Sequence, residues 1–180
     1  MNNLKDEIEK FKIGIFSLNT RRFGTLAELM IQLLYKLSDS KSLAFDKKDK
    51  KNKKVEIKFS RVMRKDEERI KVENAISQAK GANIKERILK SDDKASFDCN
   101  IQQIKTKEFD VLYYGLFFDD KVLIYKIKSE DVKKIPGYSD KQHRGNKGEG
   151  QFHINDTNIG IHDKYLDKTL SYDDLYEIFS

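Results

Sequence analysis

The stretch formed by residues 109–118 constrains the fold of this chain more than any other. It is a nearly unbroken run of apolar and aromatic residues, which is typical of a strand covered on both faces of a sheet. Asp119 and Asp120 follow as a turn, and residues 121–128 alternate between polar and apolar side chains, like the returning strand of a hairpin. The sequence therefore predicts a hairpin at the centre of a sheet, whose aromatic residues pack in the core rather than form a platform for base stacking.

Helices and further strands are predicted on both sides of this hairpin. Residues 1–12 form a short amphipathic helix, an irregular passage leads through Arg21 and Arg22, and leucines at three- and four-residue spacing predict a firmer helix over 25–37. The remaining predictions are strands at 43–46, 54–62 and 101–105, a charged helix at 65–79, a loop at 137–150 and a last helix capped by Ser171. This order indicates a mixed α/β or α+β class: one domain over residues 1–180, with a central mixed β-sheet flanked by helices.

The charge of the chain is concentrated in one segment. The sequence holds 36 Lys and Arg against 30 Asp and Glu, and residues 41–65 alone contain eleven basic and three acidic residues. A local positive field of this kind favours a polyanionic partner such as nucleic acid. The alternative is a lysine-rich surface loop that is simply solvated.

Cysteine usage and hydropathy set the expected compartment. Cys99 is the only cysteine, so an intrachain disulfide is impossible and a reducing, cytoplasmic location is expected. The start of the chain has no signal-peptide pattern, and no run approaches the roughly 18 apolar residues of a membrane span, so no membrane association is expected. A structural zinc site is not expected, because the three histidines are scattered.

The strongest chemical signal is the triplet Glu56-Ile57-Lys58, set in a strand pattern and preceded by Asp46. Alternation along a strand places Glu56 and Lys58 on one face, roughly 7 Å apart, and turns the apolar neighbours into the core. A lysine-rich turn between Asp46 and Glu56 allows the chain to fold back as a hairpin and bring both carboxylates to one site. Carboxylate oxygens favour a hard cation such as Mg²⁺. The alternative is an exposed strand face with an ordinary charge pair.

These residues resemble the catalytic signature of the PD-(D/E)xK nuclease superfamily and, within it, of the small type II restriction endonucleases. The helix segment 24–28 is similar to the helix that contributes an extra acidic residue in many members, and 102–110 resembles the strand and hairpin after the active site. Segments 142–146 and 149–153 look like a DNA-facing loop. Phe45 stands where the family usually has a proline, which leaves open whether Asp46 or Asp49 is the metal ligand.

The resemblance implies a Mg²⁺-dependent endonuclease that cleaves double-stranded DNA at a specific sequence, leaves 5′-phosphates and acts as a homodimer. Its catalytic core would span about residues 20–130 and its DNA-facing region about 137–155. It implies that Asp46, Glu56 and the Ile57 carbonyl hold the metal and that Lys58 lies by the attacking water, with Glu28 as a further catalytic acid. The residues it places against DNA are Arg61, Arg64, Gln103, Lys105, His143, Arg144, Asn146, Gln151 and His153.

Two other interpretations remain open at this point. Thr25-x-x-Glu28 matches a capping box, in which Glu28 would only satisfy the first backbone donors of its helix. The alternatives for the whole chain are a structure-specific repair or nicking nuclease of the same fold, and a non-catalytic basic module that binds nucleic acid. Loss of cleavage with retained DNA binding in Asp46 and Glu56 variants would separate a nuclease from such a module.

Overall fold

The computed structural model describes residues 2–65, 69–80, 84–141 and 148–180. Its helices are α1 (Asn2–Ser17), α2 (Thr20–Tyr35), α3 (Ala75–Lys80), α4 (Ile84–Arg87), α5 (Ser129–Val132), the 3-10 helix η1 (Ile159–Tyr165) and α6 (Tyr172–Phe179). Its strands are β1 (Ser38–Asp39), β2 (Lys47–Lys48), β3 (Lys54–Arg61), β4 (Asp98–Ile104), β5 (Val111–Phe117), β6 (Val122–Lys128), β7 (Gly150–Asn155) and β8 (Leu166–Leu170).

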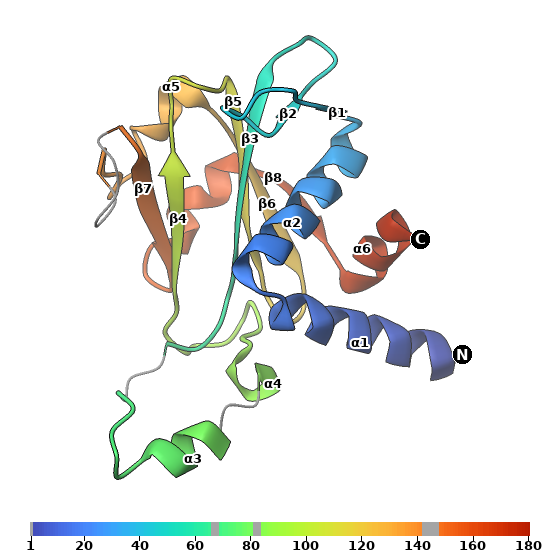
Figure 1. Cartoon of the computed structure of the whole chain (residues 1–180), viewed down its shortest axis with the longest axis vertical. Coiled ribbons are helices and arrows are strands. Elements are labelled where there is room, and N and C mark those ends of the chain that lie inside the picture. The colour runs from blue at the N-terminus through green and yellow to red at the C-terminus, as the bar shows by residue number, and fades with distance from the viewer. Residues whose placement is uncertain (1, 66–68, 81–83, 142–147) are drawn as a thin grey trace.

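The strands form one mixed sheet and one separate ribbon (Figure 1). The sheet has the order β1-β2-β3-β5-β6-β8, in which β3 and β5 run parallel and the other neighbours antiparallel. Strands β4 and β7 pair with each other as an antiparallel two-stranded ribbon. The predicted α+β class, with a central mixed sheet flanked by helices, is confirmed.

Strand β5 is the centre of the sheet, as its apolar sequence predicts. Every residue of β5 is buried, and β5 and β6 form the expected antiparallel hairpin. Gly115 is required in this strand because a Cβ atom there would lie 2.1 Å from the carbonyl oxygen of Leu123 and 2.4 Å from the Phe59 ring. The aromatic residues of this segment lie in the core, so the predicted packing role is confirmed.

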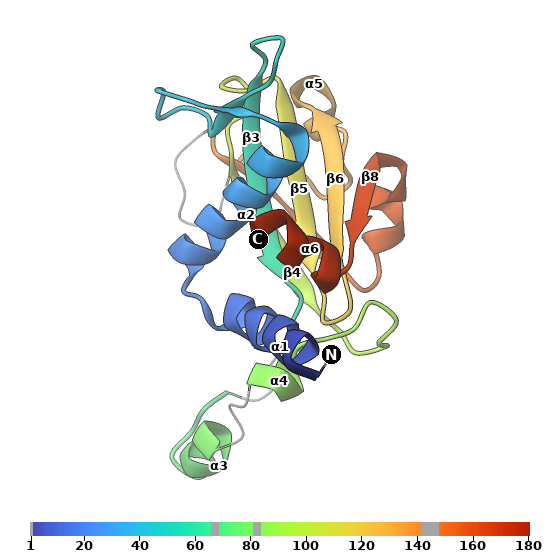
Figure 2. The same cartoon turned by 90° about the vertical axis from the view of Figure 1, so that its right-hand side faces the viewer.

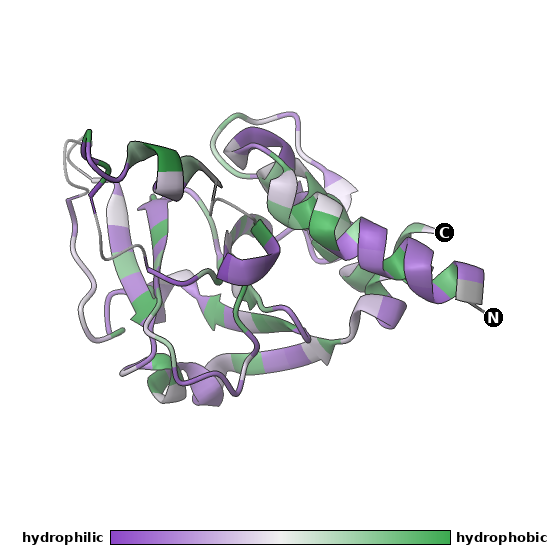
Figure 3. Cartoon of the chain, turned by 90° about the horizontal axis from the view of Figure 1, so that it is seen from below, coloured by the Kyte–Doolittle hydropathy of each residue, from purple (hydrophilic) through white to green (hydrophobic). Residues whose placement is uncertain are grey.

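The sheet is covered differently on its two faces. Helices α1, α2 and α6 pack on one face (Figure 2), where the core includes Val55, Ile57 and Tyr113. The β4–β7 ribbon covers the other face, where the core includes Leu112 and Tyr114. In Figure 3, hydrophobic and hydrophilic residues alternate along α1, as expected for a helix with one buried side. Apolar side chains fill the space between the sheet and the ribbon, and the candidate site lies where β3, the segment before β2 and the end of the ribbon meet.

Helix α2 begins earlier than its leucine spacing predicts. Asn19 caps the helix by accepting a hydrogen bond from the Arg22 backbone amide at 3.0 Å, so the expected irregular passage before Thr25 is wrong. Thr25 lies inside the helix, and its hydroxyl donates to the Arg21 carbonyl at 3.2 Å. The capping-box interpretation of Glu28 is therefore wrong, because no helix starts at Thr25.

Several other boundaries differ from the expectations. In the part of the chain that the structure describes, the charged helix expected over 65–79 is found only as α3, and the strand expected at 43–46 is replaced by β2 at Lys47–Lys48. The segment 149–153, expected as a DNA-facing loop, is mostly strand β7. The predicted last helix is confirmed, because Ser171 and Asp174 form a capping box at the start of α6. Among the described residues, no helix has both the length and the apolar character needed to cross a bilayer.

Candidate active site

Asp46, Glu56 and Lys58 meet on the face of β3 that is turned toward the ribbon. Glu56 and Lys58 lie opposite Leu112 and Tyr114 in the parallel register, which places both on the ribbon side of the sheet. The Lys58 ammonium contacts Glu56 Oε1 directly and lies 3.9 Å from Asp46 Oδ2. The prediction that two acids and one amine lie close together in space is confirmed.

The Asp46 carboxylate reaches this position because β2 covers β3 only at Lys54 and Val55. Beyond that pair, β3 is an edge strand on this side, and an edge strand presents unpaired amide groups. Asp46 accepts a hydrogen bond from the Ile57 amide at 2.7 Å, while its own amide donates to the Val55 carbonyl at 3.0 Å. The Asp46 side chain thus accepts the hydrogen bond from β3 that a neighbouring strand would otherwise accept.

Asp49 does not share this location. Its carboxylate accepts hydrogen bonds from the Lys51 and Lys53 amides at 2.8 and 2.9 Å, inside the turn between β2 and β3. Asn52 adopts a left-handed conformation in the same turn, with φ at 61°. The geometry therefore favours Asp46 over Asp49 as the acid that accompanies Glu56.

Burial and neighbouring charges shift the pKa values of Glu56 and Lys58. The Glu56 residue is only 8% exposed, and burial, aided by the nearby Asp46 charge and opposed by Lys58, raises the pKa of Glu56 to about 7. Burial opposes the charged form of Lys58, yet the charges of Glu56 and Asp46 raise the pKa of Lys58 above its usual value. The site thus holds a firmly charged amine beside a carboxyl group that titrates near neutral pH.

Glu28 belongs to the same electrostatic environment. It projects from α2, which packs along β3, and burial raises the pKa of Glu28, with a further contribution from the charge of Asp46. The charges of Lys47 and Lys58 act in the opposite direction. Glu28 is therefore placed as an acid near Asp46 and Lys58, in agreement with the location expected from the sequence.

A cavity of about 260 Å³ opens between β3, the loop before β2 and the end of the ribbon. Gln103 reaches it from a bulge in β4, where its φ is 60°, and Lys105 follows at the end of that strand. The complete lining is Leu43, Ala44, Phe45, Asp46, Glu56, Lys58, Gln103, Lys105, Glu108 and Glu149. The cavity therefore joins the predicted acids to two of the residues predicted to contact DNA.

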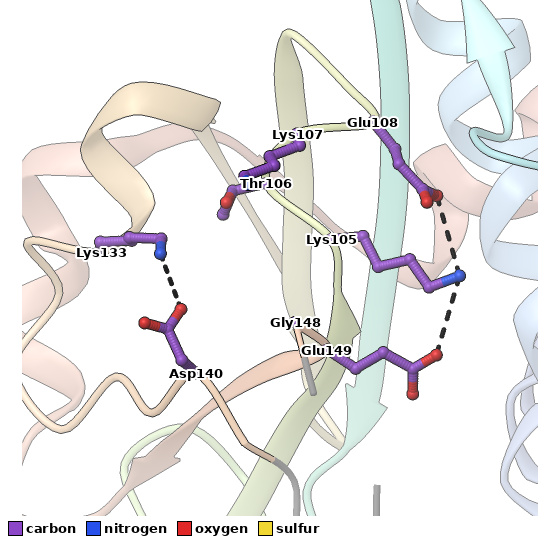
Figure 4. Close-up of a pocket in the computed structure, with 8 residues that line it drawn as sticks. All are labelled: Lys105, Thr106, Lys107, Glu108, Lys133, Asp140, Gly148 and Glu149. Atoms are coloured by element: carbon purple, nitrogen blue, oxygen red, sulfur yellow. Dashed lines mark hydrogen bonds and ion pairs between the residues drawn. The ribbon is translucent and has the colours of Figure 1, made fainter. Parts of the chain in front are cut away.

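A second cavity, of about 610 Å³, adjoins the first and shares Lys105, Glu108 and Glu149 with it. Figure 4 shows the Lys105 ammonium between the two glutamates, at 3.8 Å from Glu108 and 3.7 Å from Glu149. On the far side of this cavity, Lys133 pairs with Asp140 at 2.7 Å. Neither Glu108, in the loop after β4, nor Glu149, directly before β7, was predicted as a site residue, because both reach the cavity only through the tertiary placement of the ribbon.

The donor set is compatible with Mg²⁺. Within the described ranges, no three His, Cys, Asp or Glu side chains are gathered closely enough to hold one ion among themselves. Mg²⁺, however, commonly uses one or two carboxylates and fills its other positions with water and phosphate oxygens. Asp46 and Glu56 form such a pair, and the Lys58 ammonium already lies as a cation against them. Ile57, the third predicted ligand, lies between Glu56 and Lys58 in β3 with its side chain in the helix-side core.

The other predicted DNA contacts are dispersed. Arg61 donates to the carbonyls of Phe16 and Leu18 at 2.7 and 2.6 Å, so it joins β3 to α1 at the strand end away from the site. Arg64 is exposed just beyond that end.

The structure describes only some of the DNA contacts predicted on the ribbon and in the loop before it. In the ribbon, His153 pairs with Asp98 at 2.8 Å and Gln151 accepts from Asn100 at 3.1 Å. The remaining predictions, His143, Arg144 and Asn146, fall outside the described residues.

Comparison with protein-family models and with curated protein sequences found no match to this chain.

Proposed function

We propose that this protein is a Mg²⁺-dependent endonuclease that hydrolyses phosphodiester bonds of double-stranded DNA. The observation that carries the proposal is the meeting of Asp46, Glu56 and Lys58 in the lining of one cavity, with Glu28 nearby. Two acids that can hold a hard cation, next to an amine that keeps its charge, suit the hydrolysis of a phosphate ester better than they suit passive binding of a polyanion.

Each residue has a distinct proposed part in the reaction. Asp46 and Glu56 would hold Mg²⁺, which when bound polarises the scissile phosphate and lowers the pKa of an attacking water. Lys58 would orient that water and stabilise negative charge that develops on the phosphate oxygens. Glu28 would help to keep Lys58 charged and in place. Lys105, which lines the same cavity, would contact a phosphate next to the scissile one.

The form of nuclease proposed is a type II restriction enzyme, which cleaves at a specific sequence, leaves 5′-phosphates and works as a homodimer in the cytoplasm. Two copies related by two-fold symmetry match the symmetry of a palindromic DNA site. Digestion of phage DNA with Mg²⁺ should give discrete fragments, and sequencing of their ends should give one recognition sequence. A smear, or cutting only at nicks and junctions, would favour a repair nuclease instead.

The decisive experiment compares cleavage and binding in matched variants. Glu56→Gln and Lys58→Met should each lower the rate of plasmid cleavage by roughly a hundredfold or more, while duplex DNA is still bound in the absence of metal. The controls are Glu177→Gln and Lys10→Met, which change the same residue types at exposed positions on α6 and α1 and should cleave normally. A wild-type protein that binds DNA but never cleaves it with Mg²⁺ or Mn²⁺ would overturn the proposal.

Asp46 needs two variants, because its carboxylate also caps the Ile57 amide. Asp46→Asn keeps an acceptor for that amide, so it should lose cleavage and keep most of its stability. Asp46→Ala leaves the amide without its partner and should lose a further 1–3 kcal/mol or so of unfolding free energy. Urea denaturation measures the difference, and equal stability of the two variants would contradict the capping role.

A further inference from the structure

The segment with the highest density of lysine is a hairpin next to the candidate site. Eight of the eleven basic residues of 41–65 fall into two groups in the structure, and Lys41, Arg64 and Lys65 belong to neither. Three of them are used inside the protein: Lys47 is buried and pairs with Asp39 at 2.7 Å, Lys58 belongs to the site, and Arg61 binds backbone carbonyls of α1 and the turn after it. Five others lie in the segment we call the lysine hairpin, residues 48–54, namely Lys48, Lys50, Lys51, Lys53 and Lys54.

The lysine hairpin has a defined conformation. The Asp49 carboxylate accepts two backbone amides of the turn, the Asp49 amide donates to the Lys53 carbonyl at 3.1 Å, and the Asn52 amide donates to the Asp49 carbonyl at 2.9 Å. Lys50, Lys51 and Lys53 are exposed, and no carboxylate of the described residues lies within ion-pair distance of their ammonium groups. A fixed turn thus displays cations that repel one another in the free protein and would gain from an anionic partner.

The lysine hairpin also lies at the same end of β3 as the candidate site. It projects beyond the end of the sheet in Figure 1, and it continues directly into the part of β3 that carries Glu56. At a strand rise of about 3.3 Å per residue, Lys53 lies roughly 10 Å along the chain from Glu56. At its base, Lys51 and Lys53 border a hollow of about 440 Å³ together with Lys128 from the end of β6. The same hollow is also lined by Asp110 and Glu130, and Glu130 pairs with Lys128 at 3.6 Å, so the positive charge of this surface is concentrated on the hairpin itself.

We propose that the lysine hairpin binds the phosphate groups of duplex DNA to one side of the scissile bond, with Lys50, Lys51 and Lys53 as the contacts. This inference rests on the proposed nuclease function and assigns it a DNA-binding surface. Lysine contacts to phosphates supply affinity and position without reading the sequence. The hairpin therefore holds any DNA, whereas the sequence preference of the enzyme comes from other residues. Because the three lysines do not touch the reacting atoms, they should act on binding and leave the chemical step unchanged.

The test is a triple substitution, Lys50→Gln with Lys51→Gln and Lys53→Gln, made in the wild-type protein and in the Glu56→Gln background. In that background, without metal, fluorescence anisotropy of a labelled duplex measures binding with no cleavage. Each lost phosphate contact lowers the slope of log K against log salt by about 0.9, so the triple variant should lose about 2.7 and bind about 10- to 100-fold more weakly. Duplexes of unrelated sequence should lose affinity equally, and the cleavage rate at saturating DNA should not change.

The matched control replaces three exposed lysines elsewhere with the same net change of charge, namely Lys5→Gln with Lys10→Gln and Lys94→Gln. Lys5 and Lys10 belong to α1 and Lys94 to the segment between α4 and β4, and Figure 1 shows these parts of the chain at the end away from the hairpin. A salt slope that falls as much in this control as in the hairpin variant, or that does not fall in the hairpin variant, would overturn the inference. If the hairpin variant loses its salt slope while the wild-type protein never cleaves DNA, the binding surface stands and the nuclease proposal fails. Urea midpoints equal to that of the parent protein show that both triple variants fold.

Discussion

Replacing Glu56 with Gln should make the metal-free protein more stable at alkaline pH. The site raises the pKa of Glu56 from its ordinary value of 4.5 to about 7, mainly through burial. Between these pH values the folded protein binds more protons than the unfolded chain, so its stability falls as the pH rises. At 1.36 kcal/mol per pKa unit, ionisation of Glu56 costs the folded state about 3 kcal/mol above pH 7. A glutamine in this position has nearly the shape of the protonated acid and cannot ionise.

The assay is urea denaturation of the wild-type and Glu56→Gln proteins at several pH values in a metal chelator. The two unfolding free energies should agree near pH 4.5 and diverge up to about pH 7, with the variant more stable by about 3 kcal/mol beyond that point. The difference between the two curves reports Glu56 together with Lys58, whose pKa depends on the Glu56 charge, because groups farther away titrate alike in both proteins. Glu177→Gln, an exposed substitution on α6, should follow the wild type throughout. Parallel curves for wild type and Glu56→Gln would refute the assignment of a buried, repelled carboxylate.

Adding Mg²⁺ converts the same experiment into a test of the proposed metal site. A cation that binds only the folded protein stabilises it by RT ln(1 + [L]/Kd), so Mg²⁺ should restore stability to the wild type at pH 8 and leave Glu56→Gln nearly unaffected. Equal effects on both proteins would mean that Mg²⁺ binds elsewhere or acts only as salt.

Lys58→Met should abolish cleavage yet leave Mn²⁺ affinity unchanged or tighter by calorimetry, since it removes the cation that contacts Glu56; markedly weaker affinity would mean that Lys58 supports the metal. Gly115→Ala should lower the unfolding free energy by about 3 kcal/mol in urea, because the added Cβ would lie 2.1 Å from the Leu123 carbonyl oxygen. Ser171→Ala should cost about 1 kcal/mol and lower the thermal midpoint by about 2–4 °C, since it removes the cap of α6. An unchanged midpoint would show that α6 is held by packing alone.

The central hairpin and the pair of residues on β3 were predictable because each depends on local periodicity. A strand alternates its side chains, so Glu56 and Lys58 had to share a face wherever β3 lies in the sheet. The unbroken apolar character of 109–118 likewise required cover on both faces. The structure buries β5 on both faces. This agreement explains why the class of the fold was predicted correctly before any tertiary contact was known.

Features that depend on residues distant in the sequence were harder to predict. The start of α2 was misplaced because two competing caps, Asn19 and Thr25, lie close together, and only the backbone hydrogen bond to Asn19 decides between them. Strand β7 was missed because its register is set by β4, about fifty residues earlier in the chain. The same pairing brings Glu149 to the cavity beside Lys105. No local sequence pattern around Glu149 predicts this position.

The basic segment shows why charge alone was an incomplete guide to function. The sequence assigns the same type of side chain to Lys47, Lys53, Lys58 and Arg61, yet burial separates their roles. Lys47 neutralises Asp39, Arg61 binds the carbonyls of the α1–α2 junction, and Lys58 is held by two acids. The position of each basic residue along the chain determines its role. Basic residues in the turn before β3 are exposed, whereas those farther along β3 meet α1, α2 or the ribbon. A phosphate-binding role is therefore better placed on the exposed hairpin than on Arg61, whose donors already have partners inside the protein.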